Sequence, residues 1–235
     1  AMAASRLIFN TRCQIAEMFD IWGPECVAFT SNDTEALNIA LQGTLHPEEE
    51  TVHAICTEMD HNSVLRPLYR LEKKGMKLTI LPADCKGRIS LTELEAAIRP
   101  ETKVIVCTHA SNLTGNLNDI HAIGEIAQKY QKLFIVDAAQ TAGVFPISMK
   151  KDHIDILCFS GHKGLMGPQG TGAICVRPGV SVEPLKVGGS GVLTFQREHP
   201  QDMPEALEAG TLNSQGIAGL GAAISWIREN GTEEI

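Results

Sequence analysis

The sequence lacks the features that would place it in a membrane, on nucleic acid or in an oxidising compartment. No uninterrupted apolar run is long enough to span a bilayer, and the first residues carry no basic segment followed by an apolar core. Lysine and arginine form no run and the formal net charge is -8, which argues against nucleic acid or an anionic membrane surface as a partner. The seven cysteines are scattered and nowhere arranged as CxxC, which indicates reduced thiols. We therefore expect a cytoplasmic protein.

Several catalytic motifs are also missing. The sequence has no GxxxxGK[ST] phosphate loop, no HExxH and no GxSxG. The glycine-rich runs at 167–172 and 216–221 lack the order and the strand-to-helix context of a dinucleotide fingerprint. The eight histidines are dispersed without metal-ligand spacing, so no metal site is predicted.

The chain does contain short apolar runs that alternate with amphipathic stretches of helical period. With 235 residues, 43% of them hydrophobic, it is long enough for one large domain with a buried core, which we place at 1–235. Nearly all-apolar strands that alternate with helices predict an α/β fold, a mostly parallel sheet flanked by helices. The predicted strands are 26–30, 52–57, 78–81, 104–108, 133–136, 154–159 and 172–176, and the predicted helices are 2–19, 35–42, 63–74, 91–98, 120–130 and 217–230.

Polar residues follow most of the predicted strands. In parallel sheets ligands collect at the carboxyl ends of the strands, where loops lead into helices. The segments to examine are therefore 31–35, 58–62, 109–115, 137–140 and 160–163.

The segment 159–172 (FSGHKGLMGPQGTG) is the most informative of these. Lys163 comes directly after an apolar strand, between glycines and beside His162 and Ser160. A lysine held there and partly desolvated has a lowered pKa, which frees its amine for Schiff-base chemistry. A solvated loop lysine is the alternative.

Three further positions have both a functional and a structural interpretation. Asp137, at the end of the strand 133–136, could face a protonated ring nitrogen or simply cap a turn. Asn32 and Glu35 have the spacing of a capping box and so predict the start of a helix. This helix N-terminus could bind a phosphate group, or it could have no ligand. His61 could stack on an aromatic ring or open the next helix.

Six segments carry a joint pattern that is more specific than any one of them. They are 29–36 (FTSNDTEA), 58–64 (EMDHNSV), 108–115 (THASNLTG), 136–140 (VDAAQ), 160–163 (SGHK) and 208–213 (EAGTLN). In this order, over nearly the whole chain, they resemble the fold-type I pyridoxal-phosphate enzymes of aminotransferase class V, specifically the cysteine desulfurase and selenocysteine lyase family. The resemblance implies the large domain of such an enzyme and the cofactor pyridoxal 5'-phosphate.

The resemblance also implies a role for each matching residue. The catalytic residues would be Lys163, which carries the cofactor, Asp137, which pairs with the ring nitrogen, and His61, which stacks on the ring. Gln140 and Asn112 would contact the phenolic oxygen. The phosphate would be bound by Thr34, Ser160 and His162, with Asp33 also at the phosphate and Thr211 reaching into the site of a neighbouring subunit in a homodimer.

The chain departs from the family in two ways. The family usually has Gly-Ala where this chain has Asn32 and Asp33, and an acidic side chain fits there only if it points away and backbone N–H groups face the phosphate. The family's opening segment and its small C-terminal domain, which holds the nucleophilic cysteine and the arginine for the substrate carboxylate, are not in the sequence. We therefore expect a truncated chain that does not turn over cysteine alone.

The implied reaction is removal of sulfur from L-cysteine, leaving alanine and an enzyme persulfide whose sulfur passes to an acceptor protein. The alternatives are a selenocysteine lyase or another class V enzyme acting on a small amino acid, or a cofactor-binding fragment without catalysis. Of the cysteines, Cys85 in a turn-like segment is the one expected to be exposed, and the sequence predicts burial of Cys56, Cys107, Cys158 and Cys175 in strands.

Overall fold

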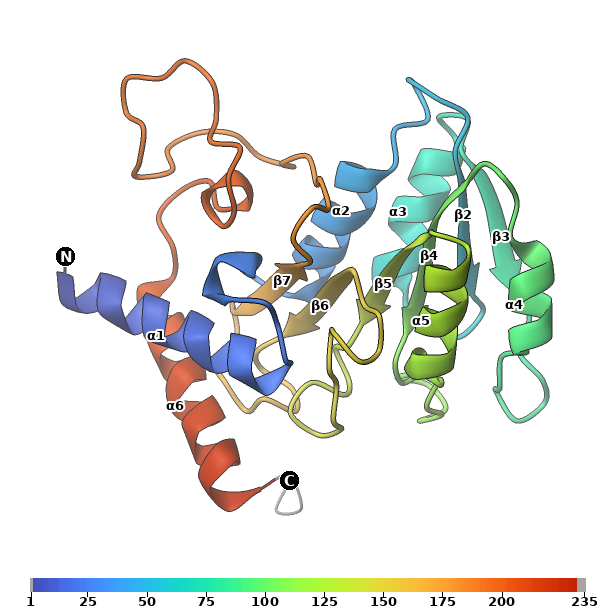
Figure 1. Cartoon of the computed structure of the whole chain (residues 1–235). Helices are drawn as coiled ribbons and strands as arrows, with labels where there is room; N and C mark the ends of the chain where they lie inside the picture. The colour runs from blue at the N-terminus through green and yellow to red at the C-terminus, as the bar shows by residue number, and fades with distance from the viewer. Residues whose placement is uncertain (1, 232–235) are drawn as a thin grey trace.

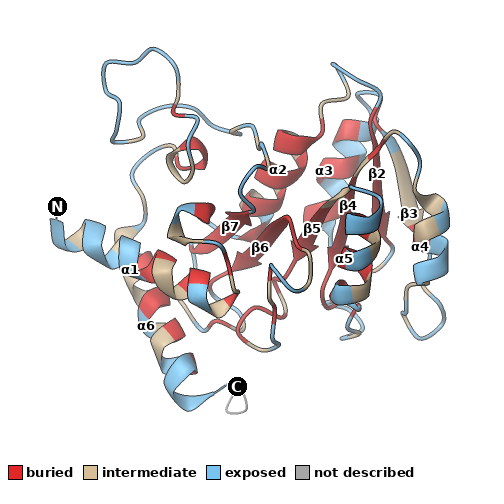
Figure 2. Ribbon diagram, in the orientation of Figure 1, coloured by how far each residue is buried: buried red, intermediate tan, exposed pale blue. Residues whose placement is uncertain are grey.

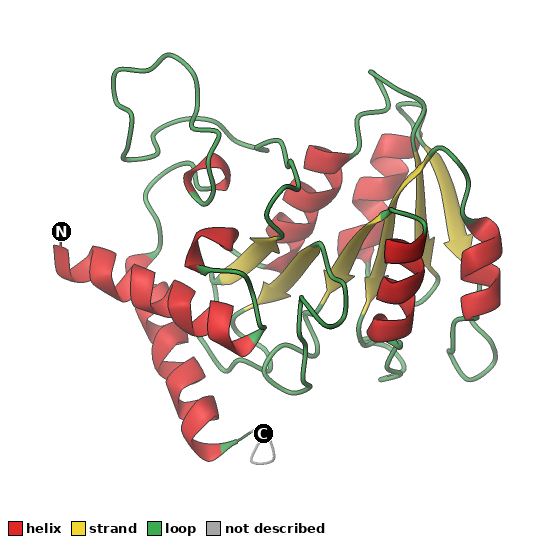
Figure 3. Cartoon of the chain, in the orientation of Figure 1, coloured by secondary structure: helices red, strands yellow, loops and turns green. Residues whose placement is uncertain are grey.

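A computed structural model describes residues 2–231, which form one seven-stranded sheet covered by helices (Figures 1 and 3). The strand order across the sheet is β1-β7-β6-β5-β4-β2-β3. Of the predicted domain 1–235, residue 1 and residues 232–235 lie outside the described residues. The strands are β1 (Val27–Thr30), β2 (His53–Thr57), β3 (Lys77–Leu81), β4 (Thr102–Thr108), β5 (Leu133–Asp137), β6 (Ile156–Ser160) and β7 (Gly172–Val176).

The predicted, mostly parallel sheet is confirmed, with one reversal at its β1 end. Strands β2 to β6 pair in parallel, whereas β7 runs antiparallel to both β6 and β1. The loop between β6 and β7, residues 161–171, is therefore a hairpin connection and not a crossover. Lys163 lies in this loop.

Helices cover both faces of the sheet, and the strands alternate their side chains between two hydrophobic clusters. Phe134 and Val136 of β5 pack into one cluster and Ile135, between them, into the other. Burial is continuous along the central strands (Figure 2). The helices are α1 (Met2–Met18), α2 (Asp33–Thr44), α3 (Asn62–Glu72), α4 (Leu91–Ala97), α5 (Ile120–Lys129) and α6 (Ser214–Asn230), with single 3-10 turns at Pro24–Cys26 and Glu205–Leu207.

Each face has its own set of helices. Helices α2 and α3 contribute to one cluster, and α1, α5 and α6 contribute to the other. Helices α1 and α6, the two ends of the chain, cross and pack against each other (Figure 1). Within residues 2–231, no helix combines the length and apolarity that crossing a bilayer requires.

A buried ion pair joins the start of the chain to its last third. The guanidinium of Arg12 on α1 donates to both carboxylate oxygens of Glu208, at 2.7 and 2.6 Å. Glu208 also accepts from the N–H of Phe29 on β1 at 2.6 Å. Both charged side chains are less than a tenth exposed, so this pair replaces water as the partner of each charge.

The predicted elements are all present, with ends shifted by up to three residues. Helix α6 begins at Ser214, not at 217, because the Asn213 side chain accepts from the N–H of Gly216 at 3.0 Å and caps the helix there. Gly231 ends it as expected, with φ of 81° and its N–H on the carbonyl of Ile227 at 2.8 Å. Periodicity of apolar residues locates the body of a helix, whereas polar caps decide its ends.

The connection from β7 to α6 is the longest segment without regular structure, and it forms the open orange loop in Figure 1. The N–H of Gly210 donates to the carbonyl of Gly189 at 2.7 Å, which closes the base of the loop. Lys186 pairs with Glu35 in the first turn of α2 at 2.5 Å. These contacts fix the base of the loop, while Phe195 at its far end is fully exposed.

Candidate active site

Nine of the ten residues predicted for the site line one cavity of about 150 Å³. It lies at the carboxyl ends of the strands, where β1, β2, β4, β5 and β6 lead into their loops. The lining predicted from the sequence is Asp33, Thr34, His61, Asn112, Asp137, Gln140, Ser160, His162 and Lys163, and Asn32, Ser63, Thr108, Ala110 and Ala139 complete it.

The hairpin loop that carries Lys163 is closed by backbone hydrogen bonds. Gly161 donates to Thr171 at 2.8 Å, and Gly167 donates back to Gly161 at 2.7 Å. A Cβ on Gly161 would lie 2.2 Å from the hydroxyl of Thr171, so only glycine permits this approach. Lys163 is exposed, and no carboxylate in the described part of the chain lies within ion-pair distance of its amine.

Asp137 is the last residue of β5 and is 2% exposed. Its Oδ1 accepts from the N–H of Ala139 at 2.9 Å. Burial raises the pKa of Asp137, and the hydrogen bond from Ala139 and the positive charges of Lys163 and His61 oppose that rise. A cationic ligand atom in the cavity would therefore meet a carboxylate whose orientation is already fixed by the N–H of Ala139.

His61 caps the N-terminus of α3 and is linked through Ser63 to α2. The His61 Nδ1 accepts from the N–H of Ser63 at 3.2 Å and lies 2.8 Å from its hydroxyl. The Ser63 hydroxyl is in turn 2.8 Å from that of Thr34. Because Nδ1 is an acceptor, a neutral His61 carries its proton on Nε2. His61 therefore opens a helix, as one of its two interpretations expected, and it also lines the cavity; its stacking on a ring stays a prediction.

Asp60 is a buried residue of the site region to which sequence reasoning gave no role. Its Oδ2 accepts from the N–H and hydroxyl of Thr57 at 2.7 and 2.8 Å, and its Oδ1 from the N–H of Thr108 at 2.6 Å. Burial raises the pKa of Asp60 to about 7, although these donors favour the ionised form. Asp60 ties the end of β2 to β4 and so fixes the backbone directly before His61. The sequence feature that could have identified Asp60 is its position in segment 58–62, directly after a predicted strand.

The predicted helix start at Asn32 is confirmed, although the reciprocal bond of a capping box is shifted by one residue, from the N–H of Asn32 to that of Ser31. Asn32 Oδ1 accepts from the N–H of Glu35 at 2.9 Å, and Glu35 Oε2 accepts from the N–H of Ser31 at 2.6 Å. The next residue, Asp33, begins the helix.

Asp33 differs from what its family position suggests. Its N–H donates to the hydroxyl of Ser160 at 3.2 Å, and its side chain, 5% exposed, lines the cavity. The Asp33 carboxyl group is therefore buried beside the site and does not extend into solvent. Among the described residues, Asp33 Oδ1 is the one buried side-chain oxygen or nitrogen without a hydrogen-bond partner.

Thr211 lies elsewhere. It lines a separate cavity of about 180 Å³ together with Ser31, Lys186 and Glu208, so the chain itself does not bring Thr211 to Lys163. Its predicted contribution to a neighbouring subunit stays a prediction.

This arrangement, with a lysine on a closed hairpin facing a carboxylate at the end of β5, can be compared with known proteins. The sequence matches the family described as aminotransferase class-V over residues 1–235. The chain belongs to this family. A cysteine desulfurase IscS of Vibrio atlanticus is 34% identical over 230 residues, which cover 97% of the chain and 54% of that protein.

Two solved structures of the same family type superpose on the chain. An apo cysteine desulfurase from Thermococcus onnurineus matches with a TM-score of 0.90 and 33% identity, over all of this chain and 59% of that one. A structure described as SspA in complex with cysteine matches with a TM-score of 0.86 and 32% identity, over 95% of this chain and 61% of that one. The chain thus spans between half and two thirds of the length of these class-V relatives.

Proposed function

We propose that this chain forms the cofactor-binding part of a pyridoxal 5'-phosphate-dependent cysteine desulfurase. The observation that carries the proposal is the single cavity in which Lys163, Asp137 and His61 meet at the carboxyl ends of the strands. Class-V relatives named cysteine desulfurase, and a structural relative that holds cysteine, support the substrate. L-cysteine is therefore preferred to selenocysteine or another small amino acid.

The residues of the cavity fit this cofactor. Lys163 offers an amine that forms no ion pair within residues 2–231, and Asp137 offers a carboxylate whose Oδ1 accepts from the N–H of Ala139. When bound, pyridoxal phosphate supplies an electron sink for a substrate carbanion. The remaining contacts follow the family pattern, with the phenolic oxygen near Gln140 and Asn112 and the phosphate near Thr34, Ser160 and His162.

The chain's own residues would act as follows. Asp137 keeps the ring nitrogen protonated, because a buried carboxylate beside a cation strongly favours the charged pair. His61 positions the ring, and its orientation is set by Ser63. The amine of Lys163 takes and returns the proton at the substrate Cα, since it lies next to that carbon once the substrate has displaced it.

The overall reaction breaks the Cβ–S bond of L-cysteine and forms an S–S bond with an enzyme thiol. The proton of that thiol ends on the methyl carbon of alanine, and the sulfur leaves as a persulfide for an acceptor protein. We expect the thiol to lie outside the strand cysteines, because an attacking thiol has to be accessible and partly ionised. The attacking thiol also has to be reduced, and this requirement favours a cytoplasmic location.

A homodimer is part of the proposal. Thr211 lies outside the Lys163 cavity, which supports a role for it in the site of a second copy, as the family pattern suggests. Light scattering of the protein with cofactor should give twice the monomer mass. A monomer that still binds the cofactor tightly would rule out the shared site.

The test of the cofactor site is chemical labelling. Incubation with pyridoxal phosphate, borohydride reduction and peptide mapping should place the pyridoxyl group on Lys163. Lys163→Ala should lose the label, and Lys73→Ala, which removes an exposed lysine at the end of α3, should keep it. Labelling at another lysine would overturn the assignment. Loaded with cofactor and left unreduced, this chain alone should give no repeated release of alanine from L-cysteine, because the attacking thiol is expected to lie elsewhere.

A further inference from the structure

Two buried carboxyl groups share the cavity. Asp33 comes from the first turn of α2 and Asp137 from the end of β5, and they are 5% and 2% exposed. Neither forms a direct ion pair among the described residues. Lys163 is the cation that acts on both, and His61 acts on Asp137 as well. Two carboxylates in one small buried cavity repel each other, so one carboxyl group of such a pair takes up a proton and becomes neutral.

The hydrogen bonds indicate which of the two holds that proton. Asp137 Oδ1 accepts from the N–H of Ala139, which favours its ionised form. Asp33 Oδ1 accepts from nothing, and the Asp33 N–H is used by Ser160. Burial and the charge of Asp137 raise the pKa of Asp33 well above its ordinary value, and Lys163 opposes this only in part. The other group close by is the buried thiol of Cys158 beneath it on β6, which is neutral.

A neutral carboxyl group also resolves the conflict at the N-terminus of α2. Helix N-termini favour anions, and Thr34, Ser160 and His162 line the same cavity as Asp33. An ionised Asp33 would repel an anion at this place, whereas a protonated one has an O–H to donate. Asp33 lines the cavity that this anion would enter, and its Oδ1 is buried there without a hydrogen-bond partner among the described residues.

We propose that Asp33 enters the complex as a neutral acid and donates a hydrogen bond to the phosphate of the bound cofactor, so that phosphate binding requires a proton on Asp33. The inference rests on the proposed function and deepens it, because it names the residue that couples phosphate recognition to pH. Asp33 acts here as a binding residue, with no part in the bond changes at the substrate.

The test is the pH dependence of cofactor affinity from pH 7 to 9, in wild type and in Asp33→Asn. The phosphate of the ligand is already a dianion in this range. Wild-type affinity should fall by up to about tenfold for each pH unit beyond the decline seen in Asp33→Asn, because the amide donates without titrating. Lys163 is present in both proteins, so its contribution cancels in the comparison. Pyridoxal, which lacks the phosphate, serves as the matched ligand and should show equal slopes in the two proteins.

A second readout uses the protein without cofactor. An acid whose pKa is raised by folding stabilises the fold at low pH and loses that contribution as pH rises, so the stability of wild type relative to Asp33→Asn should fall as pH rises above about 4. If Asp33→Asn fails to fold, Asp33→Ala replaces it and should bind more weakly without the extra pH slope.

Three outcomes would overturn the inference. Equal pH slopes in wild type and variant would show that Asp33 does not donate. An equal excess slope with pyridoxal would show that the proton does not serve the phosphate. No pyridoxyl label at Lys163 in either protein would remove the proposed function, and this inference with it, whereas a label with equal slopes would leave the proposed function standing.

Discussion

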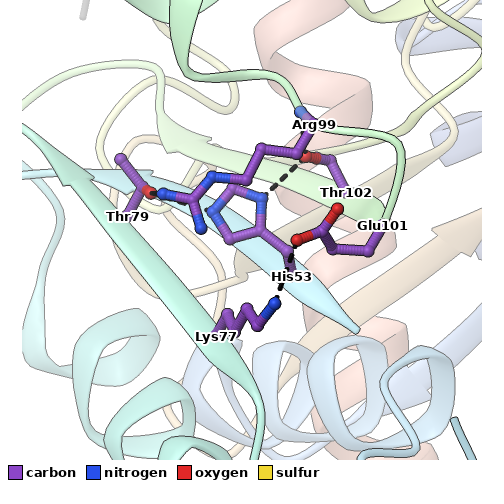
Figure 4. A network of polar contacts seen from close by, with 6 residues as sticks. All are labelled: His53, Lys77, Thr79, Arg99, Glu101 and Thr102. Carbon is purple, nitrogen blue, oxygen red and sulfur yellow. Dashed lines mark hydrogen bonds and ion pairs between the residues drawn. The ribbon is translucent and has the colours of Figure 1, made fainter. Parts of the chain in front are cut away.

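Replacement of His53 should change how the stability of the protein depends on pH. His53 begins β2 and is fully buried between the two neighbouring strands. Its Nδ1 lies 2.7 Å from the hydroxyl of Thr102 and its Nε2 lies 2.8 Å from that of Thr79 (Figure 4). Burial lowers the pKa of His53 to about 4, and the charge of Arg99 lowers it further than Glu101 raises it.

The magnitude follows from the difference between this value and the ordinary histidine pKa of about 6.5. The unfolded chain binds a proton more readily than the folded one, so His53 stabilises the fold above pH 6.5 and loses that contribution as pH falls toward 4. The complete loss is about 3.4 kcal/mol, and about 1.8 kcal/mol of it falls between pH 7 and pH 5.

The assay is urea unfolding of wild type and His53→Gln at pH 7, 6 and 5. A difference measurement is needed because Asp60, whose pKa is raised, contributes in the opposite sense over the same range. The substitution itself changes the free energy of unfolding at pH 7. Between pH 7 and pH 5, the difference in free energy of unfolding between the two proteins should shift by about 1.8 kcal/mol in favour of His53→Gln. His121→Gln is the matched control, since His121 is exposed and lies near Glu125 and Asp152.

A constant gap for His53→Gln over this range would refute the reasoning. It would mean that His53 takes up a proton in the folded protein, with water or Glu101 compensating the charge. A shift of the same size and sign in His121→Gln would point instead to a general acid effect.

Three other changes have definite expected outcomes. Asp137→Asn should keep the fold by circular dichroism but lose most alanine formation in the cofactor-loaded enzyme that includes the attacking thiol, because an amide cannot hold the ring nitrogen protonated; an undiminished rate would exclude that role. Glu208→Gln should lower the free energy of unfolding in urea by about 3 kcal/mol, because it leaves the charge of Arg12 buried without its partner. The control Glu205→Gln should change it little, and equal losses in the two variants would contradict this. In the native protein a thiol reagent should modify the exposed Cys85 before the buried thiols of Cys26, Cys56, Cys107, Cys158 and Cys175. Fast reaction of a strand cysteine would show that the sheet opens.

Much of the fold could be predicted because the strands are buried on both faces. Runs such as 104–108 and 133–136 are almost wholly apolar, which identifies central strands of a covered sheet. The same property hides strand direction, since a run that is apolar on both faces has no side that marks its orientation. The antiparallel placement of β7 between β1 and β6 therefore had no signal in the sequence.

The site divides in a similar way. Strand ends meet at one edge of a parallel sheet, so the polar residues that follow the strands could be grouped from the sequence alone. The burial of the Asp33 side chain could not, because it depends on tertiary packing at the site, where Ser160, 127 residues away, also accepts from the backbone N–H of Asp33. The links of Asp60 and Ser63 to their neighbours are likewise tertiary contacts, formed between elements that are far apart in the chain.

The closed hairpin between β6 and β7 has a consequence for timing. Because Gly161 and Gly167 fasten the loop at its base, the backbone of Lys163 is held and only its side chain is free to turn. Rotamer changes of exposed side chains take picoseconds to nanoseconds, far faster than the turnover of most enzymes. In the proposed function the Lys163 amine could therefore leave and return without any movement of the loop. Slow steps of microseconds or longer would have to come from elsewhere in the molecule, such as the long connection from β7 to α6, in which Phe195 is fully exposed.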